Sequence, residues 1–198
     1  MDDIMTDRAA PRGQLTLGGL SDGQPWRRLF FGIWPDARAA EDLTQLMARM
    51  RRDGIMRGKP VDADRLHLTL HHLGDFGDQM PSGLLPTAQK AAAMVKAPPF
   101  EVVFDRIGGT QGQFLLRASD KLAALTEFRQ ALSTALVKAG LRRHIKTTAF
   151  NPHVTLSYGF SDVPKMLIQP ISWSVRDFVL VESLLGQHKH IRQGVWPI

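Results

Sequence analysis

The sequence predicts an α+β domain made of two pseudo-symmetric lobes, each an antiparallel sheet with helices packed on its outer face, and an active-site cleft between them. The pattern His-x-Thr-Leu occurs twice, at His67 and at His153, and each copy alternates polar and apolar residues as a half-buried strand does. Strand-like and helix-like segments follow a similar order around each copy, which is typical of an internal duplication. Two such lobes related by a pseudo-twofold axis bring both His-x-Thr strands to one cleft.

The first part of the chain is divided clearly into elements. Residues 28–34 form an apolar run closed by Pro35, which predicts a strand. Asp36 is a favourable N-cap for the amphipathic segment that follows, so we expect a helix over residues 37–52. The first His-x-Thr strand is expected over residues 66–73.

The later elements follow from the same criteria. An Ala-rich helix must end before Pro98-Pro99, two strands flank Gly108-Gly109 as a hairpin, and Gly140 is a suitable C-cap for a second long amphipathic helix. The second His-x-Thr strand and one further long strand complete the order. The expected bounds are 84–96 and 122–139 for the helices, and 100–107, 113–117, 153–158 and 172–185 for the strands.

Composition limits the class of protein. A chain of 198 residues with 43% apolar residues can bury the core of one domain. The chain has no cysteine, which excludes disulfides, a thiolate nucleophile and Cys-ligated zinc, so we expect a reducing, cytoplasmic location without membrane attachment. Residues 1–27 are predicted to be an extended or mobile arm, and residues 28–198 a single bilobal domain. We expect a monomer.

The positive charge of the chain is concentrated near the two motifs. The sequence has 25 Lys and Arg against 19 Asp and Glu, a formal net charge of +6. Such charge raises the local concentration of a polyanionic substrate, although basic residues also gather at helix C-termini for structural reasons. The two clusters are Arg49, Arg51, Arg52 and Arg57, and Arg142, Arg143 and Lys146.

The two motifs have the residue types that acid–base chemistry on a phosphate ester needs. By strand alternation His67 and Thr69 share one face, as do His153 and Thr155. Two imidazoles exchange protons near neutral pH, and two hydroxyls can donate hydrogen bonds to phosphate oxygens. The same alternation places His71 on the face of Thr69, where it is expected to act as a further phosphate donor; a histidine at the rim that faces solvent is the alternative.

The chain resembles the 2H phosphoesterase superfamily. The segments LHLTL at 66–70 and NPHVTL at 151–156 are similar to its two signatures, and the opening strand at 28–31, residues 178–183 and the terminal Trp196-Pro197 extend the likeness over residues 28 to 198. The branch that it resembles most is the RNA 2′,3′-cyclic phosphodiesterases, historically called 2′-5′ RNA ligases.

This resemblance implies metal-free and cofactor-free hydrolysis of a terminal 2′,3′-cyclic phosphate, on RNA or a nucleotide, to a 2′-phosphomonoester, and it admits the reverse 2′-5′ sealing. By analogy His153 takes the proton of the attacking water and His67 protonates the leaving 3′-oxygen, while Thr69 and Thr155 hold the phosphate. Many relatives carry Arg where this chain has His71 and a basic residue where it has Tyr158. Alternation predicts that Tyr158 points away from His153 and packs.

Three alternatives stay open. A metal hydrolase has candidate ligands in the cluster His67, His71 and His72 and in the pair His188-x-His190, although no His-Glu helix motif accompanies them. A phosphoesterase of this type could also act on a different cyclic phosphate. An RNA-binding module without turnover would stack bases on exposed aromatic residues, for which the candidates are Trp34, Phe76 and Phe150.

Overall fold

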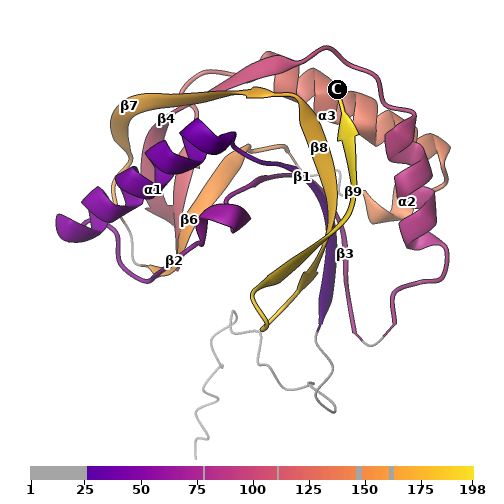
Figure 1. Cartoon of the computed structure of the whole chain (residues 1–198), viewed down its shortest axis with the longest axis horizontal. Coiled ribbons are helices and arrows are strands. Elements are labelled where there is room, and N and C mark those ends of the chain that lie inside the picture. The colour runs from indigo at the N-terminus through magenta and orange to yellow at the C-terminus, as the bar shows by residue number, and fades with distance from the viewer. Residues whose placement is uncertain (1–25, 78, 111, 146–148, 161–162) are drawn as a thin grey trace, which may run out of the picture.

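The fold is that of a computed structural model, and it confirms the α+β class (Figure 1). Nearly all of the predicted N-terminal arm, residues 1–25, lies outside the described residues, and Arg27 already belongs to the first strand. No helix of the described chain is long and apolar enough to cross a membrane. The structure describes residues 26–77, 79–110, 112–145, 149–160 and 163–198.

The strands form one antiparallel sheet rather than the two separate sheets that the sequence predicted. Its order is β7-β4-β5-β6-β3-β1-β8-β9, with β2 paired to β6. The halves β7-β4-β5-β6 and β3-β1-β8-β9 meet through β3 and β6, which share one paired position, Leu68 opposite Val154. The pseudo-twofold relation of the halves stays a prediction. The strands are β1 (Arg27–Ile33), β2 (Lys59–Pro60), β3 (Leu68–Phe76), β4 (Phe100–Thr110), β5 (Gly112–Arg117), β6 (His153–Phe160), β7 (Met166–Val175), β8 (Asp177–Leu184) and β9 (Lys189–Pro197).

The long strand predicted over residues 172–185 is two strands. Arg176 separates β7, which pairs with β4 in one half, from β8, which pairs with β1 in the other. The hydrophobic pattern does not show where the chain passes from β7 to β8. Because β8 is buried almost throughout, its apolar residues continue those of β7. The final strand β9 was not predicted, since it is a polar, partly exposed strand.

The helices agree closely with the predictions. They are α1 (Ala37–Arg52), α2 (Leu84–Ala93) and α3 (Ala123–Lys138), with short 3₁₀ turns η1 (Ala63–Arg65) and η2 (Arg142–His144). The side chain of Asp36 caps α1 by accepting a hydrogen bond of 2.9 Å from the backbone N–H of Ala39. In Figure 1, α1 packs against β7, whereas α2 and α3 pack against each other; α2 contacts β9, and α3 contacts both β3 and β4, one strand from each half.

Candidate active site

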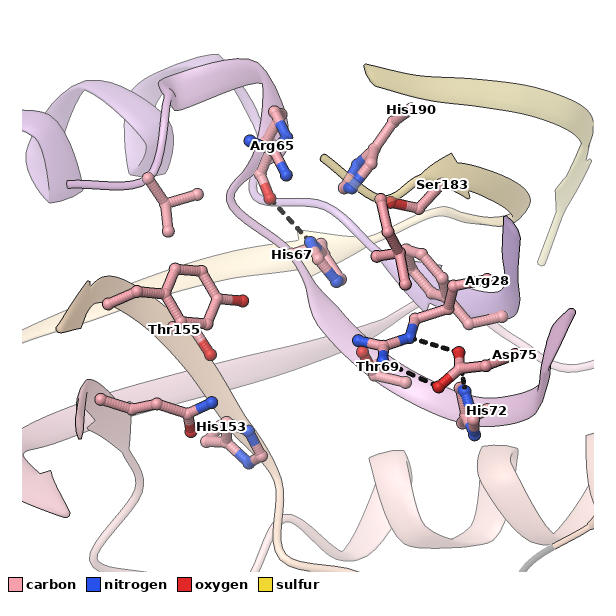
Figure 2. Close-up of a pocket in the computed structure, with 15 residues that line it drawn as sticks. Arg28, Arg65, His67, Thr69, His72, Asp75, His153, Thr155, Ser183 and His190 are labelled. Carbon is pink, nitrogen blue, oxygen red and sulfur yellow. Dashed lines mark hydrogen bonds and ion pairs between the residues drawn. The ribbon is translucent and has the colours of Figure 1, made fainter. Parts of the chain in front are cut away.

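The two His-x-Thr segments meet where the halves of the sheet join. Leu68 and Val154, the paired residues of β3 and β6, are fully buried. Their neighbours His67, Thr69, His153 and Thr155 therefore face the other side, and all four line one cavity of about 370 Å³ (Figure 2). The structure thus brings together four of the five predicted site residues.

Both catalytic candidates are held by the same backbone contact. The Nδ1 of His67 lies 2.7 Å from the carbonyl oxygen of Arg65, and the Nδ1 of His153 lies 2.8 Å from that of Asn151 (Figure 2 shows the first). A carbonyl oxygen can only accept, so each Nδ1 carries the hydrogen that it donates. In each ring Nε2 is then the nitrogen that remains to exchange a proton with a substrate.

The imidazole of His67 is enclosed by aromatic rings. It stacks on Phe30 and Trp34 with centroid distances of 4.8 and 5.2 Å, and the ring of His190 approaches it edge-on at 5.4 Å. Burial is the main reason why the pKa of His67 falls to about 4; the hydrogen bond to Arg65 opposes the shift, and neighbouring positive groups add to it. His67 is therefore neutral near pH 7.

His190 is a third histidine of the cavity, contributed by the unpredicted strand β9. Burial first, and the nearby His67 and Arg65 second, lower its pKa to about 4. Its buried Nδ1 has no hydrogen-bond partner among the described residues. The pair that the sequence offered as metal ligands is thus divided, because His190 lines the cavity whereas His188 is exposed and contacts Lys59.

Both strands contain a β-bulge directly after the motif threonine. In β3 the partners of Gly32 and Phe31 are Thr69 and His71, so Leu70 is an extra residue. In β6 the partners of Leu115 and Phe114 are Thr155 and Ser157, so Leu156 is extra in the same place. A bulge exchanges the two faces of a strand for the residues that follow it.

The bulges overturn two predictions. His71 does not line the cavity, and the expectation that it contacts the phosphate is wrong: it is 3% exposed and its Nε2 lies 3.3 Å from the carbonyl oxygen of Arg129. His72 takes its place on the cavity side. Tyr158 was predicted to point away, yet it lines the cavity and is half exposed. Strict alternation failed because the sequence does not mark either bulge.

We expect His71→Leu to change stability more than activity. Burial, and next the positive charge of Arg129, lower the pKa of His71 to about 4, whereas an unfolded histidine titrates near 6.5. The unfolded chain therefore binds the extra proton first, and stability declines as the pH falls from about 6.5 to 4. In urea titrations the variant should show a shallower decline over this window, with kcat near the native value. A large loss of kcat in a folded variant would indicate that His71 does contact the substrate.

A preformed ion pair borders the cavity beside Thr69 (Figure 2). Arg28 holds Asp75 through two hydrogen bonds of 2.7 and 2.9 Å, and the Nε2 of His72 lies 2.8 Å from the same carboxylate. The hydrogen bond from Arg28 is the main cause that lowers the pKa of Asp75 to about 2, so this carboxylate stays ionised. The sequence did not indicate this group, because Arg28 lies far from His72 and Asp75 in the chain and meets Asp75 only through the register of β1 and β3.

Among the described residues, the cations that line the cavity are Arg28 and Arg65, whereas Arg142 and Arg143 do not border it and Lys146 lies outside the described part of the chain. The last turn of α1 carries Arg49, Arg51 and Arg52, and none of them borders the cavity. Within the part of the chain that the structure describes, no three His, Asp or Glu side chains form a group that could hold a metal ion.

The comparison with protein families decides the classification. The family model described as the 2′-5′ RNA ligase superfamily matches residues 34–187, most of the chain and both His-x-Thr segments. The chain belongs to the 2′-5′ RNA ligase superfamily. As a member of this superfamily, which comprises 2H phosphoesterases, it has an architecture suited to enzymatic phosphoester chemistry.

Several solved structures share the fold. Escherichia coli LigT in its apo form is 24% identical, with a TM-score of 0.69 over 87% of this chain and 98% of LigT. TT0787 of Thermus thermophilus is also 24% identical, with a TM-score of 0.68 over 86% of this chain and 97% of that protein. LigT complexed with 3′-AMP gives 23% identity and a TM-score of 0.67 over 88% and 98%. No curated protein sequence matches the chain.

Proposed function

We propose that the protein hydrolyses 2′,3′-cyclic phosphate ends of RNA to 2′-phosphomonoesters, without a metal ion, by proton transfer at His67 and His153. The observation that carries the proposal is the matched pair of motifs: two imidazoles anchored alike at Nδ1, with two threonine hydroxyls, in one cavity. The complex of the structurally similar LigT with 3′-AMP supports a nucleotide as the ligand.

The proposed step balances as a simple displacement. Water attacks phosphorus, a new P–O bond forms and the P–O3′ bond breaks. One histidine takes a proton from the water, and the other gives a proton to the departing 3′-oxygen. Thr69 and Thr155 donate hydrogen bonds to the non-bridging oxygens, whose negative charge grows in the transition state.

The environment of His67 favours one order of proton transfer. Enclosure by Phe30 and Trp34 holds His67 in the neutral form, which accepts a proton. We therefore assign the attacking water to His67 and the leaving oxygen to His153, the reverse of the order that the resemblance implied.

An activated leaving group tests this order. Nitrophenolate departs without protonation, so loss of the proton donor matters less for bis(p-nitrophenyl) phosphate than for a cyclic phosphate. We expect His153→Ala to keep a larger fraction of the native rate on the nitrophenyl ester than on the cyclic ester. His67→Ala should lose similar fractions on both, and the opposite pattern would restore the order implied by the resemblance.

The decisive assay for the function uses a short RNA that ends in a 2′,3′-cyclic phosphate. Phosphorus NMR distinguishes the 2′-phosphomonoester product from the 3′-isomer. We expect turnover in the presence of EDTA to equal turnover without it, because both proton carriers are side chains. Affinity for RNA without turnover would favour the binding module instead, and turnover confined to other cyclic phosphates would favour a different substrate.

The pH profile of kcat/KM should have an unusually low acid limb. The reaction needs one proton shared between the two histidines, so it fails when both are protonated. Because burial lowers the pKa of His67 to about 4, the second proton binds only near that pH in the free protein. Initial rates at low substrate concentration between pH 3.5 and 9 measure this limb. A limb near pH 6.5 would show that His67 is hydrated rather than enclosed.

A further inference from the structure

Three basic side chains from separate segments meet at the edge of the cavity. Lys59 lies on β2, Arg65 ends η1, and His188 lies in the turn between β8 and β9. The Nζ of Lys59 is 3.3 Å from the Nε2 of His188, and a terminal nitrogen of Arg65 is 3.4 Å from its Nδ1. Arg65 also lines the cavity, and its carbonyl oxygen anchors the catalytic candidate His67 (Figure 2).

The hydrogen bonds of this cluster cannot all be satisfied by the protein. Lysine and arginine only donate, and a neutral imidazole has one accepting nitrogen and one N–H. Both ring nitrogens of His188 face cationic donors. In the neutral ring one nitrogen carries a hydrogen, so at least one of the two contacts brings two donors together. In the protonated ring both contacts do. A ligand with several acceptor oxygens would satisfy all of these donors.

The surroundings supply little negative charge. The single carboxylate paired with the cluster among the described residues is that of Asp62, 3.9 Å from Arg65 and largely exposed. The Nε of Arg65 is buried without a hydrogen-bond partner in the described structure. The cluster therefore has both spare positive charge and a spare buried donor.

The backbone at His188 is also unusual. Its φ is 54°, and it is the one non-glycine residue with positive φ in the described ranges. A histidine in this left-handed region is uncommon, and such positions often belong to ligand sites. The imidazole of His188 lies between Lys59 and Arg65.

We propose that Lys59, Arg65 and His188 form a second phosphate site, which binds the phosphodiester that links the terminal nucleotide to the one before it. The inference rests on the proposed function, since it assumes that a cyclic phosphate occupies the adjacent cavity. The non-bridging oxygens of one phosphate group can together accept hydrogen bonds from all three side chains. The site makes the protein prefer an oligonucleotide end over a cyclic mononucleotide.

Matched substrates isolate the second site. A nucleoside 2′,3′-cyclic monophosphate has no further phosphate, whereas a dinucleotide that ends in a cyclic phosphate has one. We expect Lys59→Ala and His188→Ala each to lower kcat/KM for the dinucleotide by about tenfold and to leave the mononucleotide within about twofold. Lys138→Ala, an exposed lysine of α3 that borders the groove between α2 and α3, should change neither.

Binding provides an independent measurement. In a His67→Ala background, the affinity for a short RNA with a 3′-phosphate should fall with salt, and Lys59→Ala should reduce the slope of log K against log salt by about 0.7, the value for one contact to a single strand. Equal losses on both substrates, or an unchanged salt slope, would overturn the second site. If native protein turns over neither substrate, the proposed function fails, and the salt slope alone decides the phosphate site.

Discussion

Replacing either His67 or His153 with alanine lowers turnover of a cyclic phosphate end by about a hundred- to ten-thousandfold, the usual range for removal of one general acid or base. Both rings line one cavity with Nδ1 committed to a backbone carbonyl, so Nε2 is the nitrogen of each ring that is left to exchange a proton. Rates under single-turnover conditions measure the loss directly. Thr69→Ala and Thr155→Ala should cost less, because each removes one hydrogen bond and no proton transfer.

The chain offers a matched control for the histidine variants. His144 is anchored in the same way, with Nδ1 2.9 Å from the carbonyl oxygen of Leu73, but it does not line the cavity. His144→Ala should therefore keep kcat within about twofold of native. Thermal unfolding of all three variants confirms that each one folds. Near-native turnover by His67→Ala or His153→Ala would reject the two-histidine mechanism.

Phe30→Ala has the second large effect, and it acts on both stability and pH dependence. The ring is 2% exposed and stacks 4.8 Å from His67, so its removal leaves a cavity that costs about 3–5 kcal/mol of unfolding free energy. Water that enters this cavity relieves the burial that lowers the pKa of His67 from 6.5 to about 4. The acid limb of kcat/KM should therefore move upward toward pH 6.5.

Two measurements separate these effects. Urea denaturation of Phe30→Ala gives the loss of stability, and the rate profile of the folded fraction gives the shifted limb. Phe30→Leu keeps most of the apolar volume and should show smaller changes in both. An acid limb that stays near pH 4 in Phe30→Ala would mean that this ring does not shield His67.

The sequence could place the two motif histidines on the cavity side of their strands because the relevant signal is local. Alternation from His67 to Thr69, and from His153 to Thr155, spans only two residues and precedes both bulges, so it placed these side chains correctly. For the residues after each threonine, alternation predicted the wrong face of the strand, as it did for His71 and Tyr158. A bulge depends on how a strand fits its neighbour, and the neighbour of β3 is a strand more than thirty residues earlier in the chain.

The rest of the site required pairings that no local pattern contains. Arg28 and Asp75 meet only because β1 and β3 pair in one register, and His190 reaches His67 only because β9 follows β8 across the sheet. The hydrophobic pattern predicted the three helices, since each has an apolar face that packs on the sheet. It also led to two separate sheets, because the contact between the halves is too short to appear in the pattern.

The pairing of Leu68 with Val154 links the packing of the core to the spacing of the two candidate histidines. This one paired position joins β3, which follows His67, to β6, which begins at His153. The separation of the two imidazoles therefore depends on how the fully buried side chains of Leu68 and Val154 pack together. Interiors are packed as densely as organic crystals and transmit small changes of volume. The distance between the two candidate histidines is thus set from beneath the cavity, by two aliphatic residues that do not line it.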